Sequence, residues 1–233
     1  MRASIADVRA RVSLIAVLLT GATLLAQSTP APPSAPTRSL AAPGTATPAA
    51  TARSPRNANY QIDATLQPDT HTIDGRAVIT WTNITQHPTS ELRFHLYWNA
   101  WRDNRSSWMR ESQLGRGPLP PRIKPDRGAI DLKTLTLGGS DTDLLAHASF
   151  IAPDDGNADD RTVLSVPLPA AVPPGGSVTV TVTWTSHVPR TYARTGVIGH
   201  YYFIAQWFPK LGVLEDAGWN CHQFHANTEF FSD

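Results

Sequence analysis

From Asn59 onward, apolar and polar residues alternate along the chain with a period of two. In the first such segment Tyr60, Ile62, Ala64 and Leu66 share one face. This pattern predicts a half-buried strand, because successive side chains of a strand point to opposite faces. The same alternation predicts further strands in residues 77–81, 91–99, 130–137, 162–168, 178–184 and 200–208.

The segments between these predicted strands carry the Gly, Pro and Asp residues that are typical of turns, as in residues 67–70. Short strands separated by such turns predict an all-β fold, which we expect to be a twisted, saddle-like β-sandwich of mostly antiparallel strands. Between Leu132 and Leu135 the apolar face changes parity, which indicates a β-bulge. Residues 104–113 are the only helix candidate.

The N-terminal segment has the pattern of an export signal. Three arginines, Arg2, Arg9 and Arg11, precede an apolar run at residues 12–25, and Ala26 follows as a cleavage point. We therefore expect a signal peptide at residues 1–26 and a secreted or periplasmic protein. An uncleaved anchor is the alternative, although the run is shorter than the ~20 residues that a membrane span needs.

Residues 27–57 are dominated by Pro, Ala, Thr and Ser and contain almost no large apolar side chain. Such a segment buries too little surface to offset the entropy lost on ordering, so it is expected to be a disordered linker. The folding domain is then expected at residues 58–233.

Charge and cysteine content narrow the classes of function. The formal net charge is +1, so no basic excess points to a nucleic-acid partner. Cys221 is the single cysteine of the chain, which excludes an internal disulfide and a zinc site made of cysteines alone.

Two segments carry side chains that are typical metal ligands. Cys221, His222, His225 and Glu229 offer thiolate, imidazole and carboxylate groups, but the spacing is not HExxH, and in a strand residues three apart point to opposite faces. His222 and His225 are therefore only weak zinc candidates. The acidic segment 153–160 lacks the register of a calcium-binding EF-hand, so a solvated turn is the expected structure.

Gln206 precedes Trp207 and Phe208 at the end of the predicted aromatic strand. A primary amide both donates and accepts hydrogen bonds, which suits recognition of an amine together with a carbonyl. Large aromatic residues are more often core than ligand contacts, so the signal from these three residues alone is weak.

Several of these segments occur together, in order, in one family. The chain resembles the N-terminal β domain of aminopeptidase N-type zinc metallopeptidases, the gluzincin aminopeptidases, and is most similar to their secreted bacterial members. The resemblance spans residues 59–233. It rests on YQIDATL at 60–66, IDGR at 73–76, WTN at 81–83, LRFHLYWN at 92–99, DRTV at 160–163, PG at 174–175, QWFPK at 206–210 and residues 219–233.

The resemblance implies a saddle-shaped β domain that sits over a thermolysin-like catalytic domain and helps to frame the substrate cleft. It implies that the whole protein removes N-terminal residues from peptides with a zinc-bound water. It also implies that Gln206 matches the family's glutamine that holds the substrate's N-terminal residue. The implied partners are the catalytic domain and, through it, a peptide; a nucleic acid is not expected, nor is a membrane span beyond the signal peptide.

The chain departs from the family in lacking the H-E-x-x-H and G-x-M-E-N motifs. Without zinc ligands there is no polarised water and no general base, so we expect no peptide hydrolysis by this chain alone. Zinc is expected only in a full-length member, and no cofactor is expected here. Because the sequence stops within an aromatic run, we expect a fragment whose β domain lacks its last strands.

Two alternatives remain open at this point. The first is a stand-alone secreted β-sandwich that binds peptides or protein partners near Gln206 and Trp207. The second is a metal-binding module that uses His222, His225 and Cys221.

Overall fold

The computed structural model describes residues 56–116 and 126–227, all of which fall within the segment Ala50–Asp233. The predicted signal peptide and all but the last two residues of the predicted linker lie outside the described residues. So does the aromatic end of the chain, residues 228–233. Within the described residues, no helix has the length and apolar character needed to cross a membrane.

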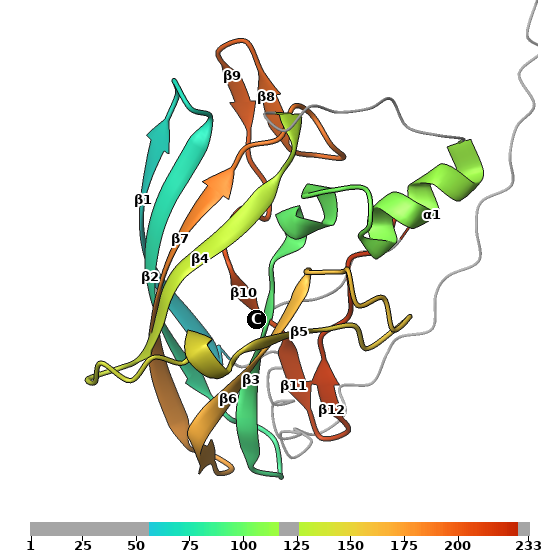
Figure 1. Cartoon of the computed structure of the whole chain (residues 1–233). Helices are drawn as coiled ribbons and strands as arrows, with labels where there is room; N and C mark the ends of the chain where they lie inside the picture. Colours follow the sequence, from blue (N-terminus) through green and yellow to red (C-terminus); the bar gives the residue numbers. More distant parts are fainter. Residues whose placement is uncertain (1–55, 117–125, 228–233) are drawn as a thin grey trace, which may run out of the picture. The chain divides into compact units, whose positions relative to one another are not determined.

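Two four-stranded antiparallel sheets make up the domain (Figure 1). The first sheet has the order β1-β2-β7-β4, and its strands span Ala58–Gln67, Thr72–Thr82, Ser177–His187 and Ala129–Leu137. The second has the order β10-β3-β6-β5, and its strands span Lys210–Leu211, Thr89–His95, Val163–Val172 and Ser149–Ile151. The prediction of an all-β, sandwich-like fold with antiparallel strands is confirmed, and the sheets do not close into a barrel.

Smaller elements complete the domain. Two hairpins pair β8 with β9 and β11 with β12. Within the described residues the helical elements include η1, α1 and η3. Their bounds are Gly196–Ile198 (β8), Tyr201–Phe203 (β9), Val213–Glu215 (β11), Gly218–Asn220 (β12), Tyr97–Trp101 (η1), Ser107–Arg116 (α1) and Leu145–His147 (η3). Helix α1 overlaps the predicted helical segment 104–113.

The inward face of the first sheet follows the alternation seen in the sequence. On β2 the buried side chains of Ile73, Ala77 and Ile79 alternate with more exposed ones. Gly75 interrupts this apolar series because the indole of Trp184 on β7 occupies the space; a Cβ at position 75 would lie 2.3 Å from that ring. The missing side chain therefore lets a large aromatic residue fill the core.

The predicted bulge on β4 is confirmed. The pairing of β4 with β7 shifts between Leu132 and Thr134, so that Lys133 is the additional residue. After the shift Leu135 is buried, because one extra residue returns the apolar series to the inner face.

Three strand predictions need correction. The predicted strand at residues 91–99 ends at His95, and Tyr97–Trp101 forms the 3₁₀ helix η1 instead. In β1 only the first half of the apolar face is half-buried, whereas Ala64 and Leu66 are exposed, because β1 is an edge strand. The predicted strand at residues 200–208 is reduced to β9, Tyr201–Phe203. The chain leaves extended geometry before Gln206, which has a φ of 55°, and a residue in this left-handed region cannot continue a strand.

Candidate functional site

Gln206 lies in the connection between β9 and β10, half-buried and in a left-handed backbone conformation. Its neighbours are held on both sides. The carbonyl of Ala205 accepts a hydrogen bond from the indole nitrogen of Trp98 at 2.8 Å, and the carbonyl of Trp207 accepts one from the hydroxyl of Ser186. Such a conformation is costly for a residue other than glycine, so it persists only where the surroundings determine it.

The aromatic residues after Gln206 form a packed platform. The ring centroids of Trp207 and Trp184 are 5.9 Å apart, and those of Phe208 and Tyr60 are also 5.9 Å apart, edge to face. The hydroxyl of Tyr60 accepts the backbone N–H of Leu211 at 2.9 Å. These contacts join the glutamine loop to β1 and β7 of the first sheet, and the Tyr60–Leu211 hydrogen bond ties that sheet to β10 of the second.

The two candidate histidines lie in the segment after β12, which is not a strand. His222 Nδ1 lies 2.6 Å from Asp154 Oδ1, and His225 Nε2 lies 3.2 Å from Asp154 Oδ2. His225 Nδ1 lies 2.5 Å from Glu111 Oε1 on α1. The expectation that the histidines point to opposite faces is therefore wrong, because the irregular backbone turns both toward the same carboxylate.

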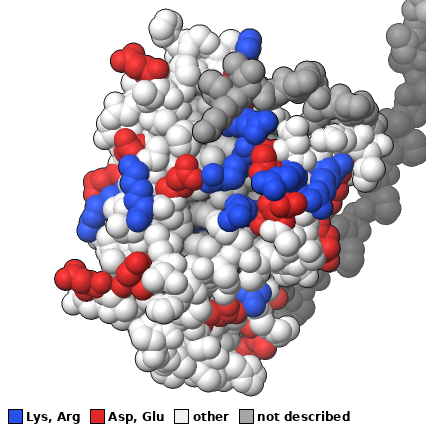
Figure 2. Space-filling model, viewed as in Figure 1, with Lys and Arg blue, Asp and Glu red and all other residues white. Residues whose placement is uncertain are grey.

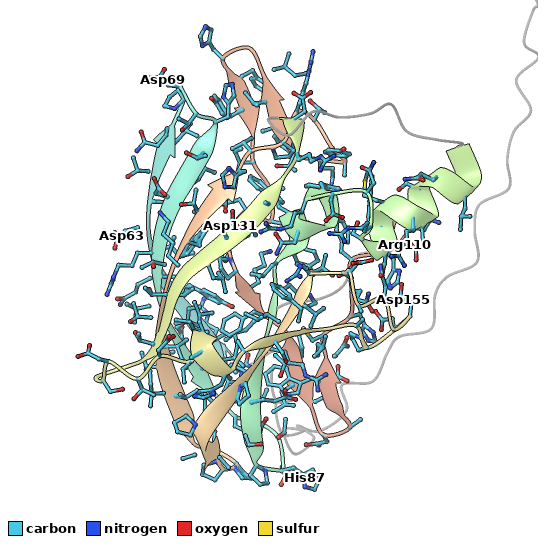
Figure 3. All side chains as sticks on the ribbon, viewed as in Figure 1. Asp63, Asp69, His87, Arg110, Asp131 and Asp155 are labelled. Carbon is cyan, nitrogen blue, oxygen red and sulfur yellow. The ribbon has the colours of Figure 1, made fainter. Side chains whose placement is uncertain are left out.

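A buried amide joins the same three parts of the chain. Gln223 is fully buried, and its Nε2 donates to Ser107 Oγ at 2.9 Å and to Asp155 Oδ1 at 2.8 Å. Its Oε1 accepts the backbone N–H of Asp154 at 3.1 Å. We use the name clasp for three segments together: residues 221–226, the acidic loop 153–160 and the start of α1. Figure 3 shows Arg110 on α1 beside the loop that carries Asp155.

The acidic loop is the turn that the sequence predicts, and most of its residues are exposed, but two of its side chains are buried. Asn157 and Asp160 are buried in it. The carboxylate of Asp160 accepts the backbone N–H of Ser107 at 3.0 Å and that of Thr162 at 2.8 Å. The loop therefore supplies the acceptors that the first turn of α1 and the start of β6 require.

The electrostatics of the clasp follow from these contacts. Burial alone would raise the pKa of Asp154, but hydrogen bonds from His222, Gln223 and His225 outweigh it and hold the pKa below its usual range. Burial alone would lower the pKa of His225, but its hydrogen bonds to Glu111 and Asp154 raise that pKa. A protonated His225 donates from both ring nitrogens and so bridges the two carboxylates.

The third metal-ligand candidate, Cys221, is buried, and burial raises the pKa of its thiol to about 12. A protonated thiol is a poor metal ligand. Among residues 56–116 and 126–227, no three His, Cys, Asp or Glu side chains are arranged to hold a metal ion. Glu229 lies outside the described residues.

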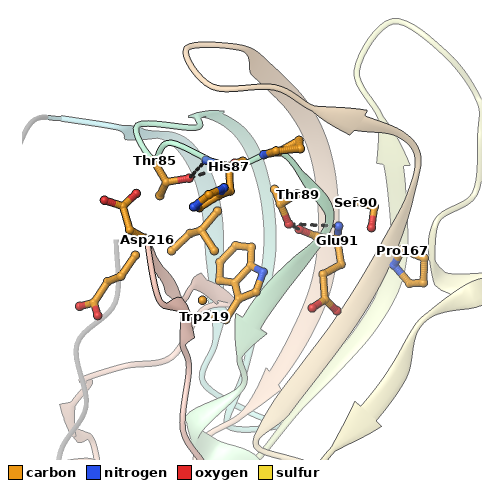
Figure 4. Close-up of a pocket in the computed structure, with 12 residues that line it drawn as sticks. Thr85, His87, Thr89, Ser90, Glu91, Pro167, Asp216 and Trp219 are labelled. Atoms are coloured by element: carbon orange, nitrogen blue, oxygen red, sulfur yellow. Dashed lines mark hydrogen bonds between the residues drawn. The ribbon is translucent and has the colours of Figure 1, made fainter.

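A cavity of about 410 Å³ separates the β2–β3 connection from the β11–β12 hairpin (Figure 4). Its carboxylates already have partners. Glu91 pairs with Arg93 at 2.7 Å, and Asp216 accepts the backbone N–H of Gln86 at 2.9 Å. We attribute Asp216 to docking of the hairpin and Glu91 to an ion pair within β3.

The structure thus gives the predicted site residues separate environments, with Gln206 in the β9–β10 connection and His222 and His225 in the clasp. Sequence reasoning missed Asp154 and Glu111 as histidine partners. The acidic loop was the available signal for Asp154, whereas nothing local marks Glu111.

The fold and these contacts define an all-β domain with a buried polar clasp. A scan against protein-family models finds no match for this chain. A search of curated proteins finds no match either.

Proposed function

We propose that this chain is the non-catalytic β domain of an exported zinc aminopeptidase and that it frames the cleft in which a peptide is held. Gln206 would contact the N-terminal residue of the peptide. The observation that carries the proposal is the left-handed backbone of Gln206, fixed on both sides by Trp98 and Ser186. Strain of this kind clusters at ligand-binding positions.

The chemistry of the glutamine supports the same assignment. Its amide can donate to a peptide carbonyl and accept from a terminal ammonium group at the same time. Because the loop is anchored by Trp207 and Phe208, the amide is presented from a rigid base. Pre-organisation lowers the entropic cost of binding. Hydrolysis itself requires zinc ligands from another domain.

The test is peptide binding by the chain, followed by NMR of the side-chain amide of Gln206. A tetra-alanine amide with a free N-terminus, at millimolar concentration, is expected to shift this resonance, and its N-acetylated form is not. Gln206→Ala should abolish the other shifts that the peptide causes. Gln61→Ala on the exposed side of β1 is the matched control and should leave them intact. Equal shifts with the acetylated peptide would contradict the proposal.

A further inference from the structure

A second cavity, of about 340 Å³, opens between β4 of one sheet and β5 of the other. Both are edge strands, and no further strand among residues 56–116 and 126–227 fills the space between them. The floor is apolar, and its buried residues are Leu96, Ile130 and Leu164. The half-buried apolar wall is formed by Leu132, Leu145 and Ala148.

The rim of this cavity carries an arginine, Arg161, that has no acidic partner among residues 56–116 and 126–227. Arg161 is exposed, and its guanidinium carbon lies 5.0 Å from the ring centroid of Phe150. Its guanidinium forms no ion pair or side-chain hydrogen bond with the part of the chain that the structure describes. Stacking on an aromatic face orients a guanidinium while leaving its N–H donors available.

The other charges of the rim are paired with each other. Asp131 lies on β4 (Figure 3). It forms an ion pair with Arg102, and His187 Nε2 lies 3.1 Å from the other oxygen of its carboxylate. Figure 2 shows that charged side chains of both signs gather in a band across the middle of this face. With one carboxylate against two arginines, the rim has an excess of one positive charge.

We propose that this cavity binds a small amphipathic monocarboxylate, with its apolar part on the floor and its carboxylate on Arg161. The volume lies at the lower end of the ~300–1,000 Å³ range of small-molecule sites, which suits one short acyl chain or aromatic ring. The planar guanidinium matches a carboxylate through two parallel N–H···O bonds. Arg161 is the one cation of the described rim outside the Arg102–Asp131 pair, which also favours a monoanion over a doubly charged phosphate.

The test is calorimetric titration of the whole chain with octanoate, below the concentration at which octanoate forms micelles. Saturable one-to-one binding is expected, and octanol is expected to bind at least tenfold more weakly. Arg161→Met keeps the apolar stem and should weaken octanoate binding about tenfold. That factor corresponds to the loss of one charge-assisted contact.

Two controls keep the result interpretable. Arg76→Met removes a positive charge from the exposed face of β2, at a residue that does not line the cavity. This variant should bind octanoate as tightly as the parent protein does. Ala148→Phe should block the cavity and abolish binding. The proposal is overturned if octanoate does not bind, if Arg161→Met binds equally well, or if Arg76→Met loses as much affinity. An unchanged unfolding midpoint verifies that Arg161→Met is folded.

Discussion

Gln223 offers the sharpest test of the clasp. Its side chain is fully buried and is the common partner of Ser107, Asp154 and Asp155, which lie 68 to 116 residues away in sequence. Gln223→Ala removes both the donor and the acceptor of this amide. The backbone N–H of Asp154 then loses its side-chain acceptor, and Ser107 Oγ and Asp155 Oδ1 each lose a donor.

The magnitude follows from the three well-formed side-chain hydrogen bonds, at 2.8, 2.9 and 3.1 Å. The fourth contact, from the backbone N–H of Asp155, is long at 3.4 Å and contributes little. At about 1 kcal/mol for each good bond, the free energy of unfolding should fall by about 3 kcal/mol. With a urea m-value of about 2 kcal/mol/M, the midpoint should fall by about 1.5 M.

Urea unfolding followed by tryptophan fluorescence measures this change. Gln61→Ala, on the exposed side of β1, removes the same side chain without a buried partner and should cost less than about 0.5 kcal/mol. Gln223→Glu should be at least as harmful as Gln223→Ala, because it places a third carboxylate beside Asp154 and Asp155. If Gln223→Ala and Gln61→Ala shift the midpoint equally, the buried amide of Gln223 contributes nothing to stability.

Three further outcomes are expected. The pKa of His225 is raised in the folded state, so the stability that its protonated ring contributes is complete below about pH 6.5 and is lost as the pH rises through the folded pKa. In urea unfolding, His225→Gln should therefore destabilise the protein more at pH 5.5 than at pH 8.5. An equal loss at both pH values would exclude the imidazolium bridge to Glu111. Gly75→Ala should lower the melting temperature through a clash with Trp184, costing about 1–3 kcal/mol; an unchanged melting temperature would mean that the indole moves freely. Cys221, with a pKa of about 12, should react with a thiol reagent at neutral pH only after denaturant is added; rapid labelling of the native protein would contradict its burial.

The sequence alone determined the four strands of the first sheet and most of its inner face. Strand periodicity is local, so the alternation through Ile79 on β2 and Val182 on β7 specified which side chains are buried. The parity change on β4 marked its bulge for the same reason. The resemblance to aminopeptidases, and with it the role of Gln206 in peptide binding, remains a prediction.

Only the tertiary structure decided how the polar residues are used. The left-handed backbone at Gln206 depends on Trp98, more than a hundred residues earlier. His225 and Glu111, which form a hydrogen bond, are separated by a similar distance in the sequence. No local sequence pattern connects the residues of either pair. Local periodicity reports the direction of a side chain, whereas its partner depends on how distant segments pack. The histidines therefore looked like surface groups or metal ligands, and packing made them part of the clasp.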